Sequence, residues 1–75
     1  MHSYKTGDVV RVVVDPVNHP DRNRIFCVPK GWQVPLELGG IYTIEDTDAT
    51  SIYINNWWVK PEAVSYPRKV EEELD

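Results

Sequence analysis

The chain has 75 residues and carries 8 basic against 12 acidic side chains, for a net charge of −4. This length supports one domain with a core too small to enclose a deep active-site cavity. The single cysteine, Cys27, excludes an internal disulfide, which favours a reducing compartment. No apolar run approaches the length of a membrane span, so we expect a soluble, cytoplasmic protein.

Acidic residues gather in residues 68–75, which we predict to be a flexible acidic tail after a folded domain over residues 1–67. Residues 1–67 keep 6 basic and 8 acidic side chains, so the predicted domain is close to charge balance. Nucleic-acid binding usually leaves a basic footprint. None is visible here, and we do not expect nucleic acid as a partner.

The first predicted strand runs from Val9 to Val14, because β-branched residues favour strand over helix. If Arg11 faces water, alternation places Val10, Val12 and Val14 on the core face.

An irregular loop of 21 residues is predicted over Asp15–Pro35, because its four prolines interrupt both ladders and helices. Loops of this length are usually functional or disordered. Within it, Ile25 to Val28 form an apolar island that we expect to fold back onto the sheet. Cys27 is then predicted to be a small buried hydrophobe.

A second strand is predicted over Leu36–Asp46, with a bulge or bend at Gly39-Gly40 and with Tyr42 and Ile44 pointing inward. After a turn at residues 46–50, residues 51–54 form the third predicted strand.

Asn55-Asn56 is predicted to be a two-residue hairpin turn, since asparagine tolerates the positive φ that such turns need. The turn pairs Tyr53 with Trp58 across the hairpin. If the isoleucines of the third strand are core residues, Trp57 joins them. Tyr53 and Trp58 then emerge together on the opposite face.

Residues 61–64 read as one helical turn begun by Pro61, and residues 65–67 as a short closing strand. This order of elements resembles the Src-homology-3-like (SH3-like) small barrel, in which a long loop follows the first strand and a helical turn separates the last two. The resemblance covers residues 4–67. Small barrels that look like this one are seen in bacterial and phage proteins. It implies a mainly β, five-stranded barrel with one short 3-10 turn and a long irregular loop.

Aromatic side chains are the best candidates for a binding site. The chain has three tryptophans and four tyrosines, and each ring brings about 150–250 Å² of surface, more than a small core can bury. We predict a protein-binding patch built from Tyr53, Trp58, Trp32 and Tyr66. The alternative is structural, because a cross-strand Tyr–Trp pair stabilises a hairpin by itself.

The long loop also carries Arg22, Arg24 and Lys30, as candidate contacts to phosphates or to an acidic partner; the alternative is a solvated loop. No base or orienting group is placed beside Cys27 by the sequence. The spacing of potential ligands matches no zinc or calcium pattern. We therefore expect no enzyme activity, no cofactor and no metal.

These observations favour a non-enzymatic module that binds a protein partner. A freestanding domain of this size suits a phage or prophage accessory protein that occupies the surface of a host protein. Two alternatives stay open: a nucleic-acid-associated barrel in which aromatic rings stack on bases, and a structural subunit of a larger assembly that uses unpaired sheet edges.

Overall fold

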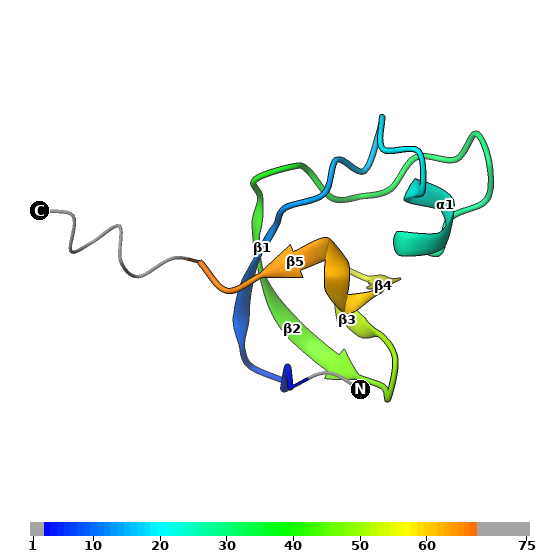
Figure 1. Cartoon of the computed structure of the whole chain (residues 1–75). Coiled ribbons are helices and arrows are strands. Elements are labelled where there is room, and N and C mark those ends of the chain that lie inside the picture. The colour runs from blue at the N-terminus through cyan, green and yellow to red at the C-terminus, as the bar shows by residue number, and fades with distance from the viewer. Residues whose placement is uncertain (1–2, 68–75) are drawn as a thin grey trace, which may run out of the picture.

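Five antiparallel strands curl into a half-barrel in the computed structural model, which describes residues 3–67 (Figure 1). The strands are β1 (Val9–Val12), β2 (Ile41–Thr47), β3 (Ile52–Ile54), β4 (Trp57–Val59) and β5 (Val64–Ser65). Their order across the sheet is β4-β3-β2-β1-β5, so β4 and β5 are its edges. The helical elements over residues 3–67 are α1 (Arg22–Ile25) and the 3-10 turn η1 (Pro61–Ala63). The mainly β prediction is confirmed.

The core lies inside the curl and draws on every strand and on the long loop. Its buried members are Val10, Val12, Ile25, Phe26, Val28, Leu36, Ile44, Ile52, Ile54, Val59, Ala63 and Val64. Val10 and Val12 of β1 are buried, as the predicted alternation requires. Val14, beyond the end of β1, is half-buried and packs against the core. Tyr42 and Ile44 also face inward, the tyrosine half-buried and the isoleucine fully.

The two predicted strands that flank the long loop are shorter in the structure. The first strand ends at Val12 rather than Val14, and the second begins at Ile41 rather than Leu36. Gly39 has a φ of 85° and forms a turn before β2, so the glycine pair marks the predicted bend rather than a bulge within the strand. The irregularity of the ladder lies further on, between Ile44 and Asp46.

The long loop is not wholly irregular, which corrects the prediction for Asp15–Pro35. It contains the single turn α1, in which the amides of Arg24 and Ile25 donate to the carbonyl of Asp21. The turn forms because Ile25 is drawn into the core, where its side chain is 2% exposed. Figure 1 shows α1 on the arch of chain that joins β1 to β2.

The hairpin is as predicted. Asn55 and Asn56 have φ values of 47° and 66°, and the register pairs Tyr53 with Trp58. The side-chain amide of Asn55 also donates to the carbonyl of Pro35 at 2.5 Å, which ties the turn to the end of the long loop.

Over residues 3–67, neither helical element is long and apolar enough to cross a membrane. The predicted acidic tail, residues 68–75, lies outside the described residues.

Replacing Asn56 tests the turn. Asn56→Gly should keep or raise the free energy of unfolding, because glycine adopts a positive φ without steric cost. Asn56→Val should lower it by about 1–2 kcal/mol, because a β-branched residue is strained there. Urea denaturation measures both variants. Thr50→Val, at an exposed turn position outside the positive-φ set, is the control; an equal loss there would contradict the assignment.

Candidate functional site

Tyr53 and Trp58 lie side by side on the outer face of the β3–β4 hairpin. Their ring centroids are 4.9 Å apart and the rings are tilted by 45°. Tyr53 is half-buried, and Trp58 remains 37% exposed. The arrangement follows from alternation, since Ile52 and Ile54 of the same strand are fully buried. The prediction that these two rings emerge together is confirmed.

The ring pair adjoins an open sheet edge. In an antiparallel ladder, hydrogen-bonded pairs alternate with pairs that exchange no bonds. A two-residue turn makes Ile54–Trp57 a bonded pair, which leaves the N–H and C=O of Trp58 pointing away from β3. No loop over residues 3–67 bonds to these groups. At Lys60, two residues after Trp58, the edge is closed, because the amide of Lys60 donates to the carbonyl of Ile25 at 2.8 Å.

A shallow hollow of about 290 Å³ lies beside the pair, lined by Cys27, Asn56, Trp57 and Trp58. Trp57 forms its inner wall: the indole is half-buried against the core, and its Nε1 donates to the carbonyl of Phe26 at 2.5 Å. The prediction that Trp57 joins the core therefore holds for the inner part of the ring.

Cys27 is exposed, so its predicted burial is wrong. The flanking Phe26 and Val28 take the inward positions, 0% and 3% exposed. The backbone between them turns through a positive φ of 50° at Cys27, which directs the thiol outward. No periodicity in the sequence signals this turn, because it depends on which neighbours the core accepts.

The other two candidate aromatics have different surroundings. Trp32 is 61% exposed in the long loop and lines a separate hollow with Arg22. Tyr66 packs against Tyr4 just beyond β5, with ring centroids 4.9 Å apart and the rings tilted by 49°. The structure thus joins Tyr53 to Trp58 and gives Trp32 and Tyr66 other contacts.

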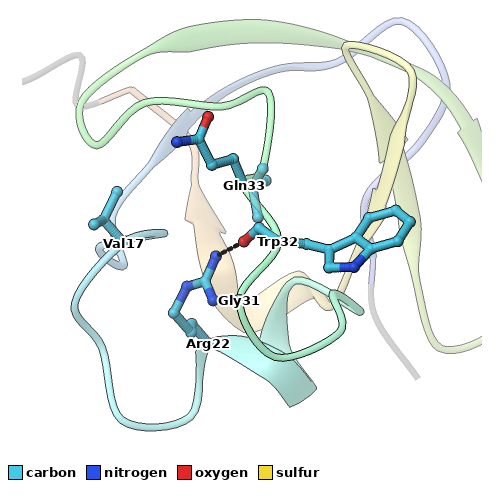
Figure 2. A pocket seen from close by; sticks show the side chains of 6 residues that line it. Val17, Arg22, Gly31, Trp32 and Gln33 are labelled. Atoms are coloured by element: carbon cyan, nitrogen blue, oxygen red, sulfur yellow. Dashed lines mark hydrogen bonds between the residues drawn. The ribbon is translucent and has the colours of Figure 1, made fainter.

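Two of the three candidate basic side chains are already engaged. Arg24 contacts both carboxylate oxygens of Glu62, at 3.0 and 3.3 Å, and lies 3.7 Å from Asp21. This exposed pair links α1 to η1, raises the pKa of Arg24 and lowers the pKa of Glu62. Arg22 donates to the backbone carbonyls of Pro16 and Trp32. Figure 2 shows the second of these bonds. Lys30 is exposed.

A contact that sequence reasoning missed ties the start of the domain to its end. The hydroxyl of Tyr66 donates to Oδ2 of Asp8 at 2.7 Å, and the amide of Lys5 donates to the same oxygen at 3.0 Å. These bonds lower the pKa of Asp8, and the carboxylate raises the pKa of Tyr66 to about 12. The hydroxyl of Tyr4 adds a bond to the carbonyl of Val64 at 3.1 Å.

No group of three or more His, Cys, Asp or Glu side chains over residues 3–67 is placed to hold a metal ion. No protein-family model matches the chain, and no curated protein or solved structure matches it either.

The Tyr66–Asp8 bond predicts a pH dependence of stability. Tyr66 has a raised pKa in the fold, so its contribution is complete below pH 10 and is lost as pH rises from 10 to about 12. Asp8 has a lowered pKa, so its contribution is complete above about pH 4 and is lost as pH falls further.

Tyr66→Phe should therefore unfold at lower urea than the wild type at pH 7, with the difference shrinking toward pH 12 and toward pH 2. Paired urea denaturation of both proteins across this range measures the difference. A gap that stays constant at every pH would show that the hydroxyl–carboxylate bond does not contribute.

Proposed function

We propose that the chain is a non-enzymatic interaction module of the SH3-like type that binds a protein partner through its aromatic face. The aromatic face comprises Tyr53, Trp58 and the adjoining hollow beside Cys27. The observation that carries the proposal is the coincidence of three features at Trp58: an exposed ring, unpaired backbone groups and a neighbouring hollow. Exposed aromatic residues of this kind are typical anchors of protein interfaces.

The open edge favours a polypeptide partner. An extended segment that runs along β4 would find the N–H and C=O of Trp58 available for ladder bonds, with the hollow next to them for a side chain. The closed position at Lys60 limits that contact to the hairpin end of the strand. We therefore expect a short extended contact together with ring packing.

The charge around the ring pair argues against a phosphate backbone as the partner. Asp46 lies opposite Tyr53 in the β2–β3 register. Among the basic candidates, Arg24 has its charge matched by Glu62, and none of the three lines the hollow beside Trp58. A protein partner remains the better fit.

The strand order, the long first loop and the placement of η1 between β4 and β5 support the SH3-like assignment. A cytoplasmic location is proposed from the single cysteine, which favours a reducing compartment. A role as a phage or prophage accessory protein acting on a host protein is proposed from the resemblance.

The test replaces the exposed ring. Trp58→Ser should weaken binding to a partner captured by the wild-type chain by at least about tenfold, as expected for a central aromatic anchor. Leu38→Ser is the matched control, because Leu38 is 56% exposed and belongs neither to the ring pair nor to the lining of its hollow. Affinity is measured by calorimetry with the purified partner.

Trp58→Thr repeats the test with a residue that keeps strand propensity, so that loss of binding is separated from loss of the hairpin. If both folded variants bind as tightly as the parent, the aromatic face is not the docking surface. If the captured partner is a nucleic acid whose affinity falls steeply with salt, the nucleic-acid alternative replaces the proposal.

A further inference from the structure

A second hollow, of about 430 Å³, lies within the long loop, away from the aromatic face. We call it the Arg22 pocket; its lining residues are Val17, Arg22, Gly31, Trp32, Gln33 and Val34. In Figure 2 the side chains of Val17, Gln33 and Arg22 surround the hollow, while the indole of Trp32 points away from it. The pocket is at the lower end of the size range of ligand sites.

The guanidinium of Arg22 is held in place by the loop itself. Its Nε donates to the carbonyl of Pro16 and its Nη2 to the carbonyl of Trp32, each at 2.6 Å. Pro16 is buried, so one of the two anchors belongs to the packed part of the loop. Two bonds from different nitrogens fix the plane of the group, which removes most of the entropy cost of using it for binding.

The same guanidinium keeps donors to spare. Over residues 3–67, Nη1 of Arg22 donates to no atom, and no carboxylate forms an ion pair with Arg22. Arg24, two residues on, is by contrast paired with Glu62. Arg22 therefore places a fixed positive charge, with unused N–H groups, at a pocket that has no acidic lining residue.

We propose that the Arg22 pocket binds a carboxylate carried on a short apolar chain. The free N–H groups of Arg22 receive the carboxylate in the fork geometry that guanidinium and carboxylate share. The amide of Gln33 adds a neutral donor, and Val17, which is 69% exposed, and Val34 contact the apolar chain.

A carboxylate fits this pocket better than a phosphate. The lining supplies one positive charge, which matches a monoanion. Phosphate sites generally combine several donors, from an arginine cluster, a backbone nest or a long helix. The helix that carries Arg22, α1, has only four residues, so it is not a long helix of that kind.

Two sources can supply this group: a free small acid, or the terminus or acidic side chain of a peptide. The test therefore uses three probes with the full, isotope-labelled chain: isovalerate, an acetylated Ala-Val dipeptide with a free carboxylate, and isovaleramide as the neutral match. Backbone amide shifts of Gly31 and Gln33 and the Nε signal of Arg22 report on binding.

We expect millimolar binding of the carboxylates at these signals, and binding of the neutral amide weaker by at least about tenfold, because it lacks the charge-assisted fork. If the dipeptide binds more tightly than isovalerate, the source is a peptide; the reverse order indicates a small acid. The proposal would be overturned by equal binding of acid and amide or by shifts that map elsewhere. It would also be overturned by the absence of any shift at 50 mM probe, which is about fiftyfold above a dissociation constant of about 1 mM.

A variant that leaves Arg22 in place tests the pocket without breaking the bonds by which Arg22 holds the loop. Gln33→Glu places a negative charge in the pocket without removing Arg22, and should weaken carboxylate binding by about tenfold or more through repulsion. Lys30→Gln makes the same change in net charge beside the pocket, and should alter binding by less than about twofold, since an exposed charge is largely screened. Unchanged binding in Gln33→Glu would overturn the proposal.

Discussion

The docking of the long loop onto β4 is the contact on which the rest of the molecule depends. Phe26 is fully buried inside the curl, a burial that contributes about 2–3 kcal/mol. Its carbonyl accepts the bond from Nε1 of Trp57, while the carbonyl of Ile25 accepts the amide of Lys60. In a domain of this size the net stability is only a few kcal/mol, so this single docking event is comparable to the whole. The loop is thus part of the core rather than an appendage.

Both candidate sites inherit their geometry from that docking. Inward placement of Phe26 and Val28 forces Cys27 outward, which forms one wall of the hollow beside Trp58. Arg22 holds the opposite side of the same loop. Its bonds to the carbonyls of Pro16 and Trp32 keep the first and last parts of the loop together. One packed segment therefore positions an apolar site at the sheet edge and a charged pocket within the loop.

The predictions that were confirmed rest on signals in short stretches of sequence. Asn55-Asn56 specifies its own turn through positive φ, and the turn then fixes every pairing of the hairpin, including Tyr53 with Trp58. The features that were missed depend on residues distant in sequence. Asp8 meets Tyr66 across 58 positions, and α1 exists because tertiary burial of Ile25 overrides a proline-rich context. Propensity and periodicity hold no information about such contacts.

The adjacent tryptophans of β4 show why an exposed ring at this position calls for more than a structural explanation. Trp57 satisfies its indole N–H on Phe26 and packs against the core, which accounts fully for its presence. Trp58 gains from packing against Tyr53, and such an aromatic pair stabilises a hairpin by about 0.5–1.5 kcal/mol. The hairpin would gain the same stability from this ring pair if the edge of β4 were covered by another segment. The open backbone and the hollow beside Trp58 add nothing to the stability of the hairpin, and they are the features that a docking partner would use.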